Sequence, residues 1–193
     1  GSLLKPLLYA HALESAHFLP QELIADIPTF IGDFQPENFD GVFVGPIHAQ
    51  DALVRSRNIP AVSLAMQLHH PSLYDFLKQA GVSRLLSEDH YGLALTLGGG
   101  EVTMEELVTL YSLLANKGQL RALQYLVKDN TAEAESGPTL LSPEAAFLVV
   151  DMLKRNVRPD AAVNTLGAAP QKQWTSAWKT GTSWGFRDAW TAG

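Results

Sequence analysis

The segment from Thr103 to Gly118 constrains the fold more than any other stretch, because it carries both a start and a stop signal for one helix. Thr103 and Glu106 match the capping box, in which each side chain satisfies a backbone N–H at the helix start. The run "LVTLYSLLANKG" follows with apolar residues at helical spacing, and Gly118 is suited to end the helix. The segment therefore predicts an amphipathic helix packed on a core.

Further stretches have the periodicity or the end signals of helices. Leucines recur at helical spacing near the N-terminus, and Ser142-Pro143 has a typical N-cap followed by a proline at the first helical position. The sequence "RNIP" is expected to break a helix, which leaves Ser56, Arg57 and Asn58 in a loop. Helices are predicted over 2–17, over 47–56, over 61–82 with an interruption at Pro71, and from 142 to about 156.

The sheet content is expected to be small. Two partly alternating segments, "QWTSAWKTGTS" and "FRDAWTAG", are joined by a glycine-containing turn, which predicts an antiparallel hairpin over 173–193. Residues 20–47 contain several prolines and glycines and suit extended loop with an isolated strand, whereas 128–138 and 158–173 are expected to be surface loops. The prediction is an α+β fold with a mainly helical body.

The composition excludes several classes of protein. There are 14 Lys and Arg against 20 Asp and Glu, so the net charge of −6 offers no basic surface for nucleic acid or an anionic membrane. No apolar run approaches the roughly 20 residues of a membrane-spanning helix, and no signal peptide is recognisable, so the chain as given is expected to be soluble. With no cysteine and six histidines that lack metal-site spacing, neither a metal nor another cofactor is expected.

Three short motifs combine into a candidate catalytic set. On a helix, a serine three residues before a lysine lies on the same face, where the amine can activate the hydroxyl. Each motif alone is weak, and Ser176 with Lys179 forms a second copy of the first, but all three in this order are hard to attribute to chance. They are Ser2-Leu3-Leu4-Lys5, Ser56-Arg57-Asn58 and Lys179-Thr180-Gly181.

These motifs in this order are characteristic of penicillin-binding proteins and serine β-lactamases. With "GSLLKPLLYAHALE", "RSRNIPAV", "LALTLGGGEVTMEELVTLYSLLANKG" and "WKTGTSWGFRDAW", the chain resembles the transpeptidase domain of class A penicillin-binding proteins, most closely the 1C type. The resemblance implies the penicillin-binding protein/serine β-lactamase-like fold, present over 1–193 as a partial domain with an incomplete antiparallel sheet. Its parts would be a nucleophile helix over 2–17, a helical body over 48–156 and an active-site hairpin over 173–193.

The resemblance also implies a role for each matched residue. Ser2 is expected to be the acylated nucleophile and Lys5 its proton acceptor, and a lowered lysine pKa would require burial and a second cation, Lys179. Ser56 would relay the proton to the leaving group, and Asn58 would hold Lys5 and the substrate amide.

The strand that follows Lys179 is expected to bind substrate. Thr180 and Thr182 would bond the terminal carboxylate, with charge from Lys179, and the backbone N–H groups of Ser2 and Thr182 would form the oxyanion hole. Gly181 would leave room for a peptide to lie along the strand, and Trp184 would line the cleft.

The implied activity is that of a peptidoglycan D,D-transpeptidase, which works through a serine acyl-enzyme on D-Ala-D-Ala stem peptides and is a target of β-lactams. The parent protein would act at the periplasmic face of the bacterial inner membrane, attached by an anchor that this chain lacks. The glycosyltransferase domain of the class, strands before the nucleophile helix, and a strand and helix after Gly193 are also missing, which is expected to leave apolar surface uncovered.

Other interpretations remain open. The chain could be a non-catalytic binding or assembly module, a D,D-carboxypeptidase or a β-lactamase-like hydrolase, although it lacks the Glu-x-x-Leu-Asn segment of class A β-lactamases. Ser2 could be only a helix N-cap, and Gly1-Ser2 also matches the remnant of a cleaved expression tag. Arg57 is expected at the cleft rim, and Arg187 is expected to form a local ion pair with Asp188.

Overall fold

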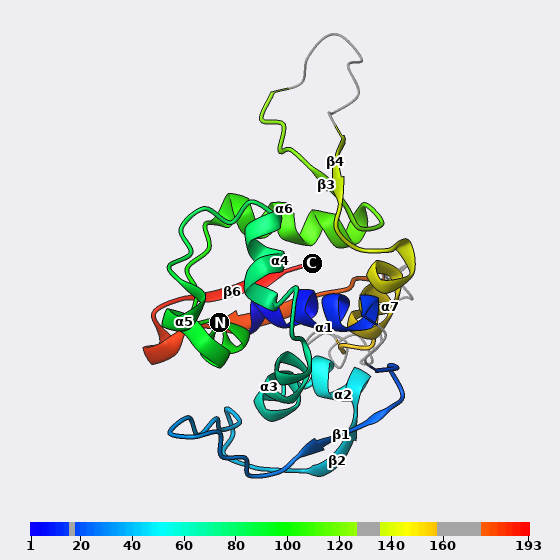
Figure 1. Cartoon of the computed structure of the whole chain (residues 1–193). Coiled ribbons are helices and arrows are strands. Elements are labelled where there is room, and N and C mark those ends of the chain that lie inside the picture. Colours follow the sequence, from blue (N-terminus) through cyan, green and yellow to red (C-terminus); the bar gives the residue numbers. More distant parts are fainter. Residues whose placement is uncertain (16–17, 127–135, 158–174) are drawn as a thin grey trace, which may run out of the picture.

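The computed structural model describes residues 1–15, 18–126, 136–157 and 175–193. Helices surround a central helix, α1, and three two-stranded antiparallel sheets lie at the periphery (Figure 1). The helices are η1 (Ser2–Leu4), α1 (Lys5–Glu14), α2 (Ala49–Val54), α3 (Asn58–Gln67), α4 (Leu73–Gln79), α5 (Glu88–Tyr91), η2 (Gly92–Leu97), α6 (Met104–Ala115), α7 (Pro143–Lys154) and η4 (Trp184–Phe186). The strands are β1 (Leu23–Asp26), β2 (Gly45–His48), β3 (Gln119–Arg121), β4 (Ser136–Thr139), β5 (Lys179–Thr182) and β6 (Ala189–Ala192).

Helix α1 is the centre of the core. Its side chains from Lys5 to Ala12 are buried on every face, because α3, α4 and α7 all pack against it. A helix buried all round is apolar all round, and the single charged residue in its first turn, Lys5, is therefore exceptional. Lys5 is therefore held by a fully buried helix, and Ser2 lies in the turn η1 directly before it.

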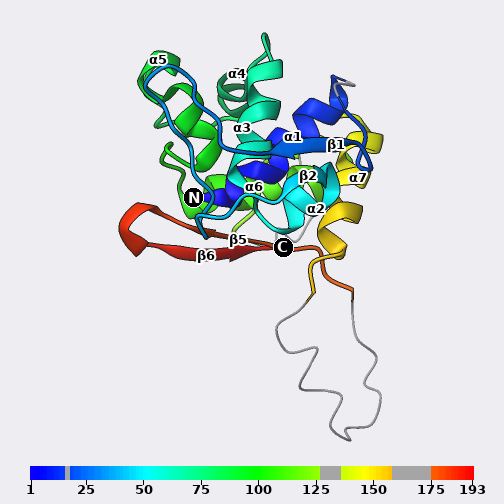
Figure 2. The same cartoon turned by 90° about the horizontal axis from the view of Figure 1, so that it is seen from below.

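The predicted hairpin is confirmed. Strands β5 and β6 pair antiparallel with Lys179 opposite Ala192 and Thr182 opposite Ala189, and Figure 2 shows the hairpin along one side of the helical body. Burial alternates along β5, so that Lys179 and Gly181 face η1 and the body while Thr180 and Thr182 are exposed. The strand thus presents its two threonines outward.

Several helix signals are also confirmed. Thr103 and Glu106 form the reciprocal capping box at the start of α6, and Gly118 follows the helix with a φ of 83° and donates to Leu113. The Ser142 hydroxyl caps α7, with Pro143 at its first position.

The observed helix boundaries near Ser2 and Pro71 differ from the predicted ones only in detail. The chain is interrupted between α3 and α4 at the cis His70–Pro71 bond, as predicted. The helix predicted over 2–17 begins as the 3-10 turn η1 and ends at Glu14, while residues 16–17 lie outside the described part.

Three local predictions are wrong. Asn58 does not lie in the loop but begins α3, because Pro60 falls in the first helical turn, where a proline removes no hydrogen bond. The strand expected within 20–47 is not isolated, since β1 pairs with β2. Residues Ser136–Thr139, expected to be loop up to Pro138, form β4 and pair with β3, while 128–135 and 158–173 lie outside the described residues.

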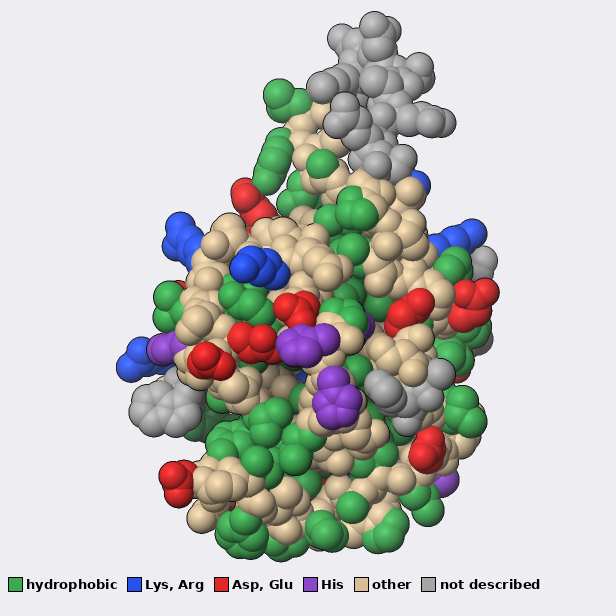
Figure 3. Space-filling model, in the orientation of Figure 1, with side chains coloured by type: hydrophobic (Ala, Val, Ile, Leu, Met, Phe, Trp, Pro, Cys, Tyr) green, Lys and Arg blue, Asp and Glu red, His purple; other side chains and the backbone are tan. Residues whose placement is uncertain are grey.

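Apolar side chains are exposed in two places on the described part of the chain. On the hairpin, Phe186 and Trp190 are exposed, and β5 and β6 pair only with each other among the described strands. A second group lies on the lower part of the face in Figure 3, where Figure 1 places β1 and β2. Exposed apolar residues between these two strands are Ile27, Phe30, Phe39, Val42 and Val44. Within the described residues, no helix combines the length and the hydropathy that crossing a bilayer requires.

The capping box predicts that Thr103→Ala is less stable than the parent chain. Loss of the hydroxyl that accepts from the Glu106 N–H should lower the free energy of unfolding by about 1 kcal/mol, measured by urea denaturation. Thr109→Ala is the matched control within the same helix, because this half-buried hydroxyl donates only to the Glu105 carbonyl of its own helix. Equal stability of the two variants would contradict a contribution from the cap.

Candidate active site

Lys5 lies at the base of the candidate site, fully buried in the first turn of α1. Its Nζ donates to the Ser56 carbonyl oxygen at 2.6 Å and to Asn58 Oδ1 at 2.5 Å, and it lies 3.4 Å from Ser56 Oγ. The first two sequence motifs therefore meet, although they are some fifty residues apart in the chain. Among the described contacts, none joins the Ser2 hydroxyl to the Lys5 amine.

Lys179 approaches the same serine from the opposite side. Its Nζ donates to Ser56 Oγ at 2.7 Å and to the Thr180 carbonyl oxygen at 2.9 Å, and its side chain is only 1% exposed. Ser56 itself has a φ of 58°, which is uncommon for a residue with a side chain and often marks a functional position. The Ser56 hydroxyl consequently lies between two buried amines that belong to different elements.

The environment lowers the pKa of both lysines. Burial, followed by the positive charges of Lys179 and Arg57, brings the pKa of Lys5 well below its ordinary value of 10.5. Burial lowers the pKa of Lys179 to about 8. The arrangement therefore favours a neutral amine at Lys5 while Lys179 keeps its charge at neutral pH.

A neutral Lys5 has a defined hydrogen-bonding capacity. A neutral amine has two N–H donors and one lone pair. The two short contacts, to the Ser56 carbonyl and Asn58 Oδ1, use both donors. The lone pair then remains available to accept a hydroxyl proton, which is the chemical requirement for a general base.

A cavity of about 780 Å³ opens above these groups. It lies between η1, the connection of α2 with α3, the outer face of β5 and the segment around Phe39. The predicted residues that line it are Ser2, Ser56, Asn58, Thr180, Gly181 and Thr182. Lys5 and Lys179 lie beneath its wall, so the structure brings together the residues that the three motifs predicted.

Gly181 is required for a reason that differs from the prediction. A Cβ at this position would lie 2.8 Å from Leu3 Cγ, 2.9 Å from Leu3 N and 3.1 Å from Ser2 N. The glycine therefore allows β5 to pack directly on the backbone of η1. The space it leaves is filled by the chain itself and not by an approaching peptide.

Other predictions around the site have mixed outcomes. Ser2 is not a capping residue, because neither η1 nor α1 has a side-chain cap at its start. The Ser176 of the second Ser-x-x-Lys copy is exposed and lines a different groove. No ion pair joins Arg187 to Asp188 among the described contacts; the Asp188 carboxylate accepts from Ser183 Oγ at 3.2 Å instead. The Trp184 side chain lies outside the described part.

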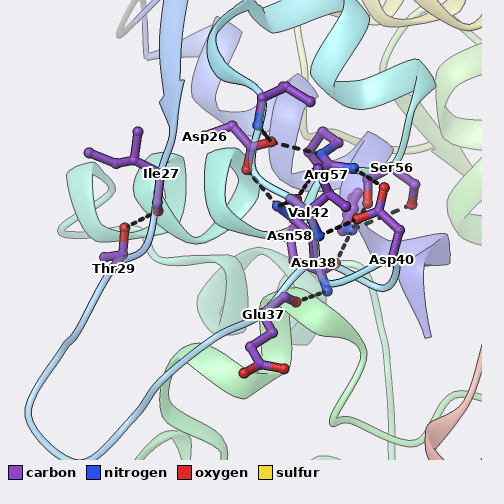
Figure 4. A network of polar contacts seen from close by, with 12 residues as sticks. Asp26, Ile27, Thr29, Glu37, Asn38, Asp40, Val42, Ser56, Arg57 and Asn58 are labelled. Carbon is purple, nitrogen blue, oxygen red and sulfur yellow. Dashed lines mark hydrogen bonds and ion pairs between the residues drawn. The ribbon is translucent and has the colours of Figure 1, made fainter.

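Arg57 is among the residues that line the cavity, but its guanidinium is almost fully buried. Its side chain is 5% exposed, and Nε donates to Asp26 and Nη1 to Asp40, both at 2.8 Å (Figure 4). The guanidinium is therefore held by β1 and by the segment that follows this strand.

The segment between β1 and β2 supplies site residues that the sequence interpretation missed. Asn38, Phe39 and Asp40 line the cavity, and the Phe39 ring contacts Phe186 edge to face with centroids 5.9 Å apart. Neither periodicity nor a motif marks these residues, because they belong to an irregular segment. Among the described residues, no cluster of three His, Asp or Glu side chains could hold a metal ion.

The fold is that of penicillin-binding protein transpeptidase domains. The solved transpeptidase domain of penicillin-binding protein 3 from Burkholderia pseudomallei is similar over 97% of this chain and 62% of its own, with a TM-score of 0.78 and 20% identity. Penicillin-binding protein 1A from Haemophilus influenzae is similar over 99% of this chain and 35% of its own, with a TM-score of 0.74 and 22% identity. At these identities the similarity establishes the fold alone.

Sequence comparison establishes the family. The penicillin binding protein transpeptidase domain family matches residues 1–189, and the chain belongs to this family. It is 35% identical to penicillin-binding protein 1C of Escherichia coli over its whole length and 28% identical to penicillin-binding protein 1F of Bacillus subtilis. The chain spans 24% and 28% of these two relatives, about a quarter of their length.

The contact at Gly181 predicts the effect of a single methyl group. Gly181→Ala should separate β5 from η1 and lower the free energy of unfolding by roughly 1–3 kcal/mol, because the Cβ would overlap the Leu3 backbone. Thr191→Ala, an exposed change on the partner strand, is the control. Urea denaturation that shows no difference between the two variants would refute the close packing of strand on helix.

Proposed function

We propose that the chain is the acyl-transfer part of a peptidoglycan D,D-transpeptidase. The observation that carries this proposal is the position of Ser56 Oγ between the buried amines of Lys5 and Lys179, in the wall of a cavity that Ser2 also lines. Burying two amines lowers the stability of the fold, so a functional reason is needed for their presence. Perturbed pKa values next to a cavity are typical of catalytic sites. Membership of the transpeptidase family supports the same conclusion.

In the first step Ser2 Oγ attacks the carbonyl carbon between the two D-alanines of a stem peptide. Lys5 accepts the hydroxyl proton, for which its lowered pKa and free lone pair are suited. The negative charge moves to the carbonyl oxygen, where the backbone N–H groups of Ser2 and Thr182 would stabilise it. The close packing of β5 on η1 at Gly181 supports this pairing of N–H groups.

The C–N bond then breaks and D-alanine leaves. Its nitrogen needs a proton, which would pass from Lys5 through the Ser56 hydroxyl, since Ser56 lies within reach of Lys5 and is oriented by Lys179. The product is an ester of Ser2. An amine from a neighbouring stem attacks this ester, forms the new amide and returns the proton to Ser2 by the reverse route.

Substrate binding would use the outer face of β5. Thr180 and Thr182 expose their hydroxyls to the cavity, and Lys179 lies next to them with a charge at neutral pH. This combination suits the terminal carboxylate of a D-Ala-D-Ala peptide and the equivalent carboxylate of a β-lactam. In the whole protein, the reaction would take place at the periplasmic face of the inner membrane.

Acylation by a penicillin tests the proposal. The folded chain should gain the mass of one drug molecule, and Ser2→Ala should abolish the gain, because the hydroxyl that forms the ester is missing. Ser176→Ala is the matched control, since it removes the serine of the other Ser-x-x-Lys copy. An adduct that persists in Ser2→Ala would refute the role of Ser2, and a folded chain without any adduct would favour the non-catalytic binding module.

The two lysines predict a bell-shaped pH dependence of acylation. The rate constant should increase with pH as Lys5 loses its proton, and it should fall about tenfold per pH unit above the pKa of Lys179, which is about 8, as the carboxylate loses its cation. A guanidinium stays charged, so Lys179→Arg should lack the alkaline decrease. The profile can be measured with a fluorescent penicillin, and a rate that still increases above about pH 9 in the parent chain would exclude this role of Lys179.

A further inference from the structure

Three polar residues to which the proposed reaction gives no role form a buried group beside the cavity. Asp26 is 0% exposed, Asn38 4% and Arg57 5%, and they come from β1, from the segment after it and from the α2–α3 connection (Figure 4). Buried charged groups are rare unless they are paired, and here the pairing is complete. Arg57 Nε donates to Asp26 Oδ2 at 2.8 Å, and Asn38 Nδ2 donates to Asp26 Oδ1 at 2.7 Å.

The group also holds the irregular segment that forms one wall of the cavity. Arg57 donates through Nη2 to the Val42 carbonyl and through Nη1 to Asp40, and Asn38 Nδ2 donates to the same Val42 carbonyl at 2.9 Å. The Val44 N–H donates to Asp26 at 3.2 Å. A segment without regular secondary structure is thus held by the side chains of Arg57, Asp26 and Asn38.

The same group contacts the catalytic residues directly. Asn38 Oδ1 accepts from the Asn58 N–H at 2.8 Å, and Asn58 Nδ2 donates to the Glu37 carbonyl at 2.6 Å, which orients Asn58 Oδ1 toward Lys5. Arg57 lies between Ser56 and Asn58 in the chain, so its position determines where both neighbours point. Ser56 needs such support, because its positive φ is unfavourable for a residue with a side chain.

We propose that Arg57 is a positioning residue, which together with Asp26 and Asn38 fixes Ser56 and Asn58 around the Lys5 amine and thereby sets the rate of serine acylation. The inference rests on the proposed function. The inference extends that function by assigning a role to Arg57, the middle residue of the Ser-x-Asn motif. In this role Arg57 acts through its two neighbours.

The test measures acylation of the folded chain by a fluorescent penicillin in variants of Arg57. Arg57→Lys keeps the charge but lacks the fork of donors that reaches Asp26, Asp40 and Val42 together, so the rate constant should fall roughly 10- to 100-fold. Asp33→Asn is the matched control: it removes an exposed carboxylate of the same segment that does not line the cavity and leaves the contacts of Arg57 intact, so the rate should stay within about twofold.

The pH profile separates positioning from a merely structural role. The charged groups that face Lys5 are Lys179 from β5 and Arg57 from the α2–α3 connection, and both lower its pKa. Arg57→Met removes one of these charges, so the acid limb of the acylation profile should move to higher pH, whereas Arg57→Lys should leave the limb in place. A structural defect would lower the fraction of labelled protein and leave the rate constant and the limb unchanged.

Each outcome decides the inference. An Arg57→Lys rate constant equal to the parent's, or a loss of labelled fraction alone, would overturn it. If Arg57→Lys does not fold, Asn38→Ala removes the acceptor of the Asn58 N–H without leaving a charge unpaired, and the same decrease in rate is expected. A parent chain that takes no label refutes the proposed function instead; the inference is then decided by a crystal structure of Arg57→Lys, in which Ser56 and Asn58 should be displaced from the Lys5 amine, and unchanged contacts would overturn it.

Discussion

The site depends on two amines that share one hydroxyl group in the interior of the protein. Lys5 and Lys179 are both almost inaccessible to solvent, and Ser56 Oγ lies within hydrogen-bonding distance of each. Two ammonium groups this close cannot both keep their ordinary pKa without water, so at least one is driven toward the neutral form. Burial lowers the pKa of both lysines, and the positive charges of Lys179 and Arg57 add to this effect at Lys5. The proposed role of Lys5 as proton acceptor follows from this repulsion between two buried ammonium groups.

The two amines stay close together because the surrounding fold prevents either of them from moving away. Lys5 cannot turn toward solvent, since α1 is surrounded by helices on every side. Lys179 cannot move away, because Gly181 locks β5 onto the backbone of η1. Ser56 is kept in an unfavourable backbone conformation by its flanking residues, one of which is tied to the buried carboxylate of Asp26. The packing of α1, the contact of β5 with η1 and the Arg57–Asp26 ion pair thus together restrict the positions of the two amines and the Ser56 hydroxyl.

Local signals in the sequence predicted the local structure. The caps of α6 and α7, the interruption at Pro71 and the β5–β6 hairpin each follow from residues within a few positions of one another. The three motifs also predicted which side chains meet, but only through the resemblance to a family, because periodicity cannot bring residue 5 to residue 56.

The parts that could not be predicted depend on long-range contacts without a pattern. Asp26 and Asn38 are single polar residues in an irregular segment, and nothing near them in the sequence indicates that Arg57 would fold back to pair with them. The reason for Gly181 was misassigned for the same cause, since the contact with Leu3 joins opposite ends of the chain. Direct titration of the lysine side chains by NMR, with the Cε resonances assigned by substitution, tests the central claim. The account predicts that Lys5 titrates well below 10.5, and a Lys5 midpoint at its ordinary value would contradict it.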